Sequence, residues 1–290
     1  MSDHDTQHYP TTVRGNKQTE WLIKQAINEG SFGAVFTCVN KNTGQRAAIK
    51  FEKEGIAATQ IHYEYQIYKQ LKSDYFPQVL DAGNALNQNN VDYKYMIMEL
   101  VGEDLSHVRH RSTKYKLKLF EKTMRGIEAL HNQGYIHRDI KPKNLCLAIA
   151  KSPNVKIVDL GLAKRYVSIE GKHIKNQLKK SHVGTMRYAS YNSTAYTQSS
   201  RRDDIESLIY TFVNIFNKKL PWQSSKDFAT KKKKTQFIHT LKTICSPRRV
   251  CKGLPSCFER ILINAKHLHF NEKPPYFKYY TLIQADIDKF

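Results

Sequence analysis

Two short segments of the chain carry side chains suited to handling a metal ion and a proton. Residues 137–144 read HRDIKPKN, and DLG begins at residue 159. Asp139, Asn144 and Asp159 offer carboxylate or amide oxygens, which are the ligands that Mg²⁺ prefers. Phosphoryl transfer from Mg-ATP requires this set of groups. We therefore expect Asp139 to accept the proton of a substrate hydroxyl, and Asn144 and Asp159 to hold the metal ions.

Three other residues of this segment have different expected roles. Lys141 lies two residues after the proposed base and can stabilise charge that develops on the transferred group. His137 is expected to be a packed structural residue, and Arg138 to find an anion on a neighbouring loop. A polar turn without chemistry is the alternative interpretation, and the set of oxygen ligands argues against it.

A glycine-containing segment, NEGSFGAV at residues 28–35, lies between two expected strands. Glycines there let backbone N–H groups approach phosphate oxygens that a Cβ would obstruct. Asn28 stands where the pattern G-x-G-x-x-G has its first glycine, and Asn tolerates positive φ better than most residues. Taken alone, the segment fits an ordinary hairpin turn at least as well.

Lys50 and Glu64 are a candidate ion pair. On a strand over residues 47–51, Lys50 shares a face with Ala48. On the helix that follows, Glu64 falls within an inward apolar stripe. A buried carboxylate requires a cation, and Lys50 is the candidate, although a partly exposed Glu64 at the edge of the stripe is the alternative. The pair would place Lys50 on the α- and β-phosphates of ATP.

Hydrophobic periodicity predicts the elements that position these residues. Before residue 98 it indicates strands over 21–27, 34–39, 47–51 and 93–98 and one helix over 59–72. After residue 98, helices dominate. One helix has an apolar stripe formed by Leu117, Phe120, Met124, Ile127 and Leu130, and Gly134 would end it. A second would be capped by Asp203 or Asp204 and run to Phe216, apolar all round and therefore buried.

Composition favours a compact intracellular protein, in the cytoplasm or the nucleus. The amino terminus has no apolar run that would serve as a signal peptide or an anchor, and we expect no membrane association. The five cysteines lack the short paired spacing of zinc sites, which favours reduced structural thiols. Residues 1–17 are polar and unpatterned, and we expect a flexible extension there.

The net charge of +21 belongs to one part of the chain. Of 47 Lys and Arg and 26 Asp and Glu, residues 1–98 hold ten of each, which leaves 37 and 16 for residues 99–290. Such a charge attracts anionic partners. Four lysines at 231–234 could form a nucleic-acid patch, a nuclear import signal or a solvated face. Without an aromatic-interleaved basic array, we expect no nucleic-acid partner.

The motifs together resemble the signature set of eukaryotic protein kinases, with AAIK at 47–50, Glu64, HRDIKPKN and DLG. Further blocks resemble the casein kinase I family. They are IHYEYQIYKQL around Glu64, MELVG from Met98, GTMRYASYNS at 184–193, SRRDDIESL at 200–208, LPWQ at 220–223 and CKGLPS at 251–256. RYAS-x-N at 187–192 stands where most kinases carry Ala-Pro-Glu. The resemblance extends from about Trp21 nearly to the carboxyl end.

The resemblance implies an α+β, bilobed kinase domain over residues 18–290, with a mainly β lobe over 18–98 and a mainly α lobe over 99–290. It implies ATP and Mg²⁺ as cofactors and, from Lys141, specificity for Ser and Thr, with Thr185 bridging Asp139 and Lys141. Met98 would guard the adenine pocket, with the hinge at Glu99 to Val101. The residues expected to bind ATP are Asn28, Gly30, Ser31, Gly33, Val35, Ala48, Lys50, Met98, Glu99 and Leu100.

Members of the resembled family commonly phosphorylate acidic or already phosphorylated proteins, and the matching basic positions here are Lys180, Arg187 and Lys234. Two departures are Ser224 and Ile209, where the family has glycine. We expect a monomeric enzyme. A pseudokinase scaffold, or a basic protein that binds nucleic acid or microtubules, is the alternative, and the presence of Lys50, Glu64, Asp139, Asn144 and Asp159 favours the enzyme.

Overall fold

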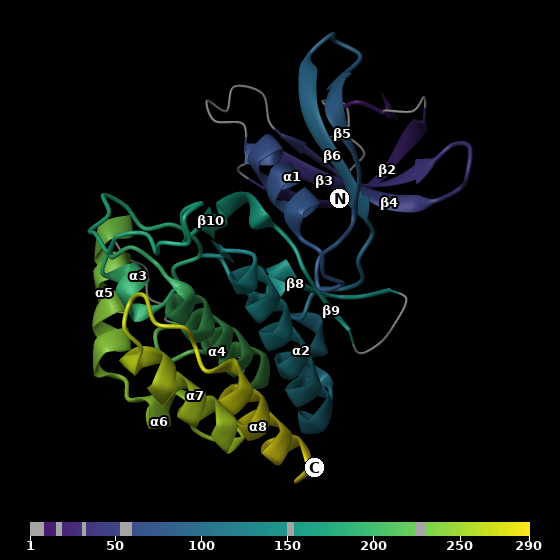
Figure 1. Cartoon of the computed structure of the whole chain (residues 1–290). Helices are drawn as coiled ribbons and strands as arrows, with labels where there is room; N and C mark the ends of the chain where they lie inside the picture. Colours follow the sequence, from purple (N-terminus) through teal and green to yellow (C-terminus); the bar gives the residue numbers. More distant parts are fainter. Residues whose placement is uncertain are drawn as a thin grey trace. The chain divides into compact units, whose positions relative to one another are not determined.

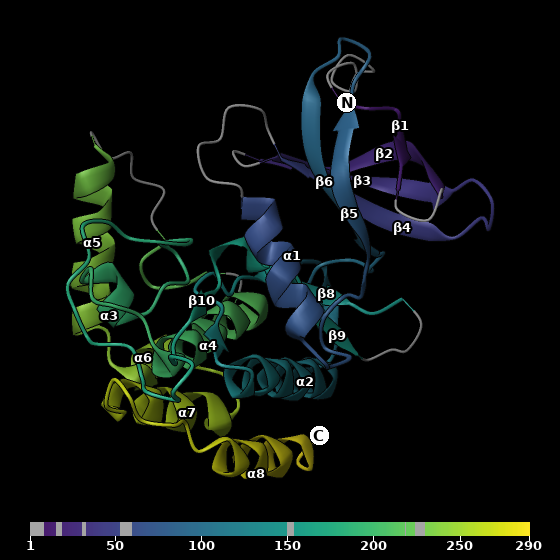
Figure 2. The same ribbon diagram turned by 45° about the horizontal axis from the view of Figure 1, so that its top comes forward.

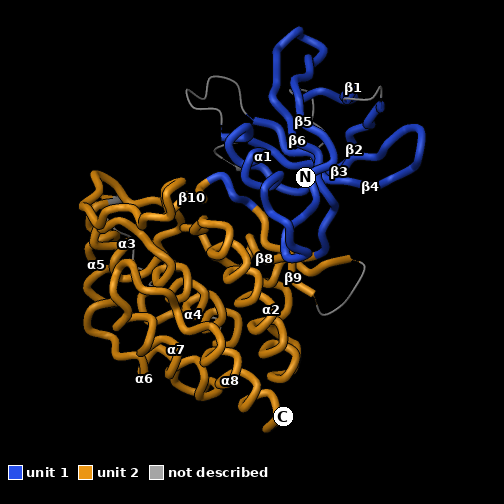
Figure 3. The backbone as a smooth tube through the Cα atoms, in the orientation of Figure 1, with its two compact units in different colours: residues 1–102, 159–161 blue, residues 103–158, 162–290 orange. Residues whose placement is uncertain are grey.

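The computed structural model describes residues 9–15, 19–30, 33–52, 60–149, 154–217, 219–223 and 230–290. Figures 1 and 2 show its helices and strands in two views. The chain forms two compact units, one of residues 1–102 with 159–161 and the other of residues 103–158 with 162–290 (Figure 3). The first is rich in strands and the second is helical. This is the predicted α+β, bilobed organisation, with the first division of the chain after residue 102 instead of residue 98.

The first unit is built on an antiparallel sheet of six strands in the order β1-β2-β3-β4-β6-β5. The strands are β1 (Thr12–Arg14), β2 (Glu20–Gly30), β3 (Gly33–Asn40), β4 (Arg46–Glu52), β5 (Val79–Leu86) and β6 (Asp92–Glu99). Four of them confirm the predicted strands, with slightly longer bounds. The two outer strands, β1 and β5, were not predicted.

The two faces of this sheet have different surroundings. One face carries the aromatic and aliphatic core of the unit, in which Phe36, Ile49, Phe51 and Ile97 are at most 3% exposed. Side chains alternate between the faces of a strand, so Ala48 and Lys50 belong to the opposite face. The predicted sharing of a face by Ala48 and Lys50 is confirmed by this pattern.

The amino-terminal segment corrects the prediction of a flexible extension over residues 1–17. Tyr9 is 7% exposed, and its ring lies 5.1 Å from that of Phe36 and 5.3 Å from that of Tyr93, measured between centroids. Val13 on β1 is 1% exposed and pairs with Trp21. Residues 9–15 therefore belong to the core of the first unit, because two apolar side chains in a polar segment suffice to anchor it. Residues 1–8 and 16–18 lie outside the described part of the chain.

One described helix, α1 (Gln60–Gln70), follows β4 and confirms the prediction over 59–72. Its buried side chains are Ile61, Glu64, Ile67 and Tyr68. Glu64 therefore lies on the inward stripe of the helix and not at its exposed edge.

The second unit contains seven α-helices in the described ranges. They are α2 (Thr113–Asn132), α3 (Tyr191–Thr194), α4 (Arg201–Asn217), α5 (Lys231–Ile244), α6 (Pro247–Val250), α7 (Ser256–His267) and α8 (Tyr276–Ile287). Two short antiparallel pairs join β7 (Tyr135–Ile136) with β10 (Lys164–Arg165), and β8 (Leu145–Leu147) with β9 (Val155–Ile157).

The two helices predicted for this unit are both present. The five residues of the apolar stripe on α2 are fully buried, and Gly134, at φ +83°, follows its end as predicted. Every residue of α4 from Asp203 to Ile215 is buried. This helix packs against α2, α3 and α7 (Figures 1 and 2). A helix that is apolar all round is stable only in such surroundings.

The acidic residues at the start of α4 do not cap it in the way predicted. The helix begins at Arg201, which makes Ser200 the residue before it. Asp203, the third residue of the helix, accepts a hydrogen bond from the Ser200 N–H at 2.7 Å, as the acidic residue of a capping box does. Asp204 instead accepts hydrogen bonds from the backbone N–H groups of His137 and Arg138. Its carboxylate serves the segment that holds Asp139, not the helix end.

The cysteines agree with the expectation of structural thiols. All five cysteines are buried and free. In the ranges that the structure describes, no helix is long and apolar enough to cross a bilayer.

Candidate active site

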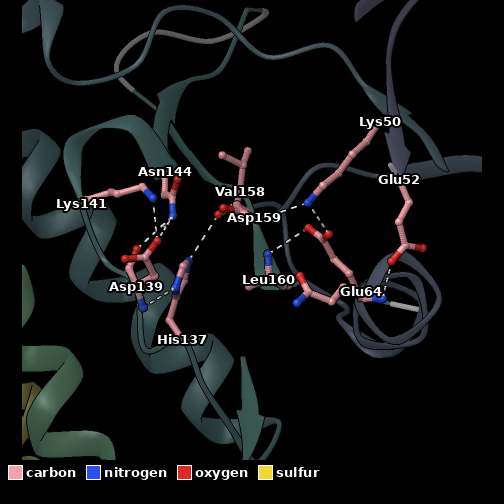
Figure 4. Close-up of polar contacts among 11 residues, drawn as sticks. Lys50, Glu52, Glu64, His137, Asp139, Lys141, Asn144, Val158, Asp159 and Leu160 are labelled. Atoms are coloured by element: carbon pink, nitrogen blue, oxygen red, sulfur yellow. Dashed lines mark hydrogen bonds and ion pairs between the residues drawn. The ribbon is translucent and has the colours of Figure 1, made fainter. Parts of the chain in front are cut away.

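Lys50 and Glu64 form the predicted ion pair within the first unit. The Lys50 Nζ lies 2.6 Å from Glu64 Oε2 and 3.1 Å from Asp159 Oδ1, as Figure 4 shows. The other Glu64 oxygen, Oε1, accepts a hydrogen bond from the Leu160 N–H at 2.9 Å. The Glu64 side chain is 1% exposed and that of Lys50 is 22% exposed. The pair therefore joins β4, α1 and the DLG segment.

The charges of this group depend on one another. Burial acts to lower the pKa of Lys50, but the carboxylates of Glu64 and Asp159 outweigh burial and raise that pKa. Burial raises the pKa of Glu64, whereas Lys50 and the N–H of Leu160 act to lower it. Lys50 is consequently held as an ammonium, and it is the cation that a buried Glu64 requires.

The start of α1 is tied to the strand that carries Lys50. Glu52, at the end of β4, accepts a hydrogen bond from the Gln60 N–H at 2.8 Å (Figure 4). A carboxylate at a helix amino terminus binds an otherwise unsatisfied N–H and is favoured by the helix dipole. This contact fixes the start of α1 one turn before Glu64.

The predicted adenine-pocket residues lie on the same sheet. Val35 is opposite Lys50 and Ala48 is opposite Met98, so these four side chains share one face. Ala48 and Met98 are 6% and 9% exposed. The predicted hinge begins at the end of β6, because Glu99 is the last residue of that strand and Leu100 lies beyond it.

The glycine-containing segment lies where the paired antiparallel strands β2 and β3 meet, between two strands as predicted. Gly33 has φ +152°, and a Cβ there would lie 1.9 Å from the carbonyl oxygen of Phe51 on β4. Close approach to β4 therefore explains this glycine. Asn28 is a strand residue opposite Val35 and is not among the residues with positive φ, so it needs no left-handed conformation. Gly30 pairs with Gly33, and Ser31 lies outside the described residues.

In the second unit, Asp139 is held by three groups. Lys141 Nζ donates to Asp139 Oδ2 at 2.6 Å, and the Thr185 N–H donates to Asp139 Oδ1 at 2.7 Å. Asn144 Nδ2 donates to the backbone carbonyl of Asp139 at 2.9 Å. Lys141 Nζ also lies 3.4 Å from Thr185 Oγ1. The predicted bridge between Asp139, Lys141 and Thr185 is formed, and it fixes the orientation of the Asp139 carboxylate. Asp139 as a whole is 6% exposed.

The backbone before Asp139 is strained and is stabilised by Asp204. Arg138 has φ +68°, a conformation that residues other than glycine rarely adopt. Asp204 accepts from the N–H groups of His137 and Arg138 at 2.7 and 3.0 Å, and also binds His131 Nε2 at 2.9 Å. Burial acts to raise the pKa of Asp204, but the contact with His131 and these N–H donors lower it. A buried anion thus holds the turn that presents Asp139.

His137 and Arg138 differ in how far they meet expectation. His137 is fully buried, and its Nε2 contacts the carbonyl oxygen of Val158 at 3.3 Å, as expected of a packed residue. Arg138 Nε donates to the carbonyl oxygen of Leu162 at 2.7 Å, and the anion expected for Arg138 stays a prediction.

The two predicted metal ligands suit Mg²⁺ by their chemistry. Asn144 uses its Nδ2 to bind the protein, and this orientation leaves its amide oxygen as the end suited to a cation. Asp159 is held at φ +64°, with a side chain that is 43% exposed and one oxygen on Lys50. Each residue thus supplies a hard oxygen ligand of the kind that Mg²⁺ retains beside phosphates and water.

The three residues predicted to bind a substrate anion lie at the surface of the second unit, and their common role stays a prediction. The side chains of Lys180, Arg187 and Lys234 are exposed. Arg187 lies over the ring of Tyr188 with its Cζ 6.0 Å from the centroid. None of the three forms an ion pair with another described residue.

The structure brings together another group of cations, Arg138, Lys164 and Lys179, which we did not predict. Arg138 and Lys179 line a small hollow together with Ser181, His182 and other polar residues. Lys164 donates to Gln198, which also lines that hollow, at 2.9 Å. Burial, together with the nearby charges of Lys179 and Arg138, lowers the pKa of Lys164 to about 8. The sequence offered only a basic composition here, because residues 138, 164 and 179 come from distant segments.

A comparison with protein families agrees with this geometry. A family model described as a protein kinase domain matches residues 21–263. Because the match covers most of the 290 residues, the chain belongs to the protein kinase family. It is therefore a phosphotransferase by family, and the use of ATP and Mg²⁺ is general in that family.

Proposed function

We propose that this protein is a serine/threonine kinase of the casein kinase I type, which transfers the γ-phosphoryl group of ATP to Ser or Thr in acidic or phosphorylated protein segments. The observation that carries the proposal is the arrangement of Asp139, Lys141 and Thr185. It is supported by the sequence blocks GTMRYASYNS and SRRDDIESL, which resemble that family.

The proposed roles follow from the contacts of each side chain. ATP supplies the phosphoryl group, and Mg²⁺ neutralises part of its charge. Lys50 presents an ammonium to the phosphates, oriented by Glu64. Asp139, fixed by Thr185 and Lys141, accepts the proton of the substrate hydroxyl.

Lys141 and the metal ligands complete the proposed site. The Lys141 side chain is 24% exposed. Its ammonium can stabilise charge on the transferred group while it keeps its ion pair with Asp139. Asn144 and Asp159 would hold Mg²⁺. On the sheet, Val35, Ala48 and Met98 would contact the adenine ring, with Glu99 and Leu100 at the hinge.

The proposed preference for anionic substrates rests on a group of cations in the second unit, which also holds Thr185. Arg138, Lys164 and Lys179 lie close together, and their mutual repulsion would be relieved by a carboxylate or a phosphate. The exposed residues Lys180, Arg187 and Lys234 are the alternative binding set. We favour the first group because its charges already lie side by side.

The activity is tested by radiolabel transfer from ATP to a Ser-containing and a Thr-containing peptide, compared between the wild type and Asp139→Asn. The proposal predicts transfer that the substitution reduces by roughly 10²- to 10⁴-fold. A Tyr-only peptide serves as the specificity control. If the protein binds peptides and ATP equally well in both forms without transfer, it is a scaffold and not an enzyme.

The anion preference is tested with three versions of one peptide, unmodified, acidic and phosphorylated. Wild type should prefer the last two. Lys164→Ala combined with Lys179→Ala should abolish the preference, whereas Lys180→Ala combined with Lys234→Ala should retain it. The reverse result would assign the anion site to the exposed set. Indifference of the wild type to all three peptides would contradict the anionic substrate class.

A further inference from the structure

Lys242 on α5 is a buried lysine whose partners are backbone carbonyls. Its residue exposure is 1%, and its Nζ donates to the carbonyl oxygens of Met186 and Ala189 at 2.9 and 2.5 Å. The same Nζ lies 4.9 Å from the ring centroid of Trp222 and 5.4 Å from that of Tyr210. Among the described residues it forms no ion pair with a carboxylate.

Burying an ammonium at this position is energetically unfavourable. Burying a charge without a counter-ion is unfavourable, and methionine has a similar length without the charge. What the ammonium supplies, and methionine lacks, is N–H donors for two carbonyls on either side of Arg187. The charge therefore serves the backbone of residues 186–189.

Trp222 completes this arrangement from a different segment. Its indole Nε1 donates to the carbonyl oxygen of Arg187 at 2.7 Å, and the residue is 2% exposed. The hydroxyl of Tyr188 donates to Asn214 Oδ1 on α4 at 3.1 Å. Side-chain donors from α5 and from the turn before it thus bind three carbonyls within four consecutive residues.

The segment held in this way leads directly to the proposed base. Thr185 precedes Met186, and its N–H donates to Asp139 while its carbonyl oxygen accepts from the N–H groups of Tyr188 and Ala189. The side chain of Arg187 is exposed although its carbonyl is fixed inside. Residues 186–189 therefore present their outer side next to Asp139, where a peptide carrying the reacting hydroxyl must lie.

We propose that Lys242 is a positioning residue for the protein substrate: together with Trp222 it fixes the backbone of residues 186–189 in the conformation that accepts the substrate peptide beside Asp139. This inference rests on the proposed kinase function. It predicts an effect on the peptide that is separate from any effect on ATP, because Lys242 and Trp222 bind residues 186–189 of the second unit, whereas the Lys50 group belongs to the first.

The test compares Lys242→Met with Lys118→Met, which removes an exposed lysine from α2. Peptide KM, ATP KM and kcat are measured for each variant. Lys242→Met should raise the peptide KM about tenfold, the loss expected for buried hydrogen bonds, and leave the ATP KM within twofold. Trp222→Phe removes one donor and should raise the peptide KM about threefold. Lys118→Met should match the wild type.

Hydrogen exchange of the peptide covering residues 183–192 gives a second readout that needs no activity. Exchange should be faster in Lys242→Met and Trp222→Phe than in the wild type, with no change in β2–β4. Trp222→Phe also keeps the inference testable if Lys242→Met does not fold.

Three results would count against these conclusions in different ways. A peptide KM within twofold of the wild type in both variants would overturn the positioning role. An equal rise in the KM of peptide and of ATP would overturn it too, because it would show a general structural role. A wild type without Asp139-dependent transfer would instead refute the proposed function, and this inference with it.

Discussion

Lys50 and Lys242 are buried lysines with opposite surroundings. Lys50 faces two carboxylates, Glu64 and Asp159, and these raise its pKa. Lys242 faces two carbonyl oxygens, and burial lowers its pKa to about 7, although the charge of Glu206 acts against the fall. Lys50 is therefore held as a cation. Lys242 has a pKa close to neutral pH, and its Nζ binds two backbone carbonyls.

The difference shows what each buried charge does. The ion pair of Lys50 with Glu64 orients an ammonium of which 22% of the side chain remains exposed, and this exposure is what the proposed contact with phosphates requires. A charge satisfied by backbone groups, such as Lys242, orients the chain itself. Asp204 is the anionic counterpart of Lys242, because it binds the N–H groups of His137 and Arg138.

The largest expected effect is that of Lys50→Met. Removing the ammonium should reduce kcat/KM for phosphoryl transfer by on the order of 10²- to 10³-fold, since charge on the phosphates loses its stabilising partner. Lys242→Met should spare the ATP KM, so the two substitutions separate the roles. Steady-state transfer kinetics with varied ATP measure both, and a Lys50→Met enzyme with unchanged kcat/KM would contradict the account of the first lysine.

Asp204→Asn is the next largest change and extends the comparison to a buried anion. The amide can accept one of the two backbone N–H groups but not both at full strength, so the free energy of unfolding should fall by about 3 kcal/mol. Chemical denaturation measures this change. Asp74→Asn, at an exposed position, is the control and should change the stability little. Equal stabilities for both variants would contradict the stabilising role of Asp204.

Gly33→Ala tests the close approach between the start of β3 and β4, the strand that carries Lys50. An alanine Cβ would lie 1.9 Å from the Phe51 carbonyl oxygen, whereas at Gly44, φ +71°, nothing lies within 4 Å. Gly33→Ala should therefore cost about 2 kcal/mol more stability than Gly44→Ala. At Gly44 the substitution meets backbone strain alone, whereas at Gly33 it meets backbone strain and the clash, and the difference between the two unfolding midpoints measures the added cost. Equal unfolding midpoints for the two variants would show that β4 moves to accommodate the added Cβ.

A pH dependence of stability is expected to separate the two lysines, with an effect that is small for each pH unit. Between pH 7 and pH 10.5 the unfolded chain binds a proton at Lys242 that the folded chain does not, so unfolding takes up a proton and rising pH opposes it. The stability of the wild type relative to Lys242→Met should rise with pH by up to about 1.4 kcal/mol per unit.

Lys50 provides the internal control for that measurement. Its pKa in the folded protein is raised, so its contribution to stability is fully present below its unfolded pKa of 10.5 and is lost only as pH rises through the folded pKa. The stability of the wild type relative to Lys50→Met should stay constant from pH 7.5 to pH 9. Denaturant unfolding at these two values decides the matter, and parallel behaviour of the two lysines would contradict their assigned surroundings.

Short-range patterns made part of this molecule predictable. The alternation on β4 and the stripe on α1 place Lys50 and Glu64 toward one another, and the spacing within HRDIKPKN fixes Asp139 and Lys141 on one loop. The strand β5 was missed because its sequence, VLDAGNAL, contains Asp, Gly and Asn, which are rare in strands, and pairing with β6 overrides that preference.

The remaining site residues depend on contacts between distant segments. Asp204 looked like a helix cap, yet its partners lie 66 and 67 residues earlier. In the sequence, Lys242 is one of the 37 Lys and Arg of residues 99–290, and only the structure shows that it is buried against residues 186–189. Local periodicity does not encode such partners.

The central claim is that Asp139 accepts a proton from a Ser or Thr hydroxyl during phosphoryl transfer. The most direct measurement is the initial rate of radiolabel transfer from ATP to an acidic Ser/Thr peptide, for the wild type and for Asp139→Asn at equal concentrations of folded protein. The account predicts transfer by the wild type and a rate lower by roughly 10²- to 10⁴-fold in the variant. Equal rates, or no transfer by the wild type, would contradict it.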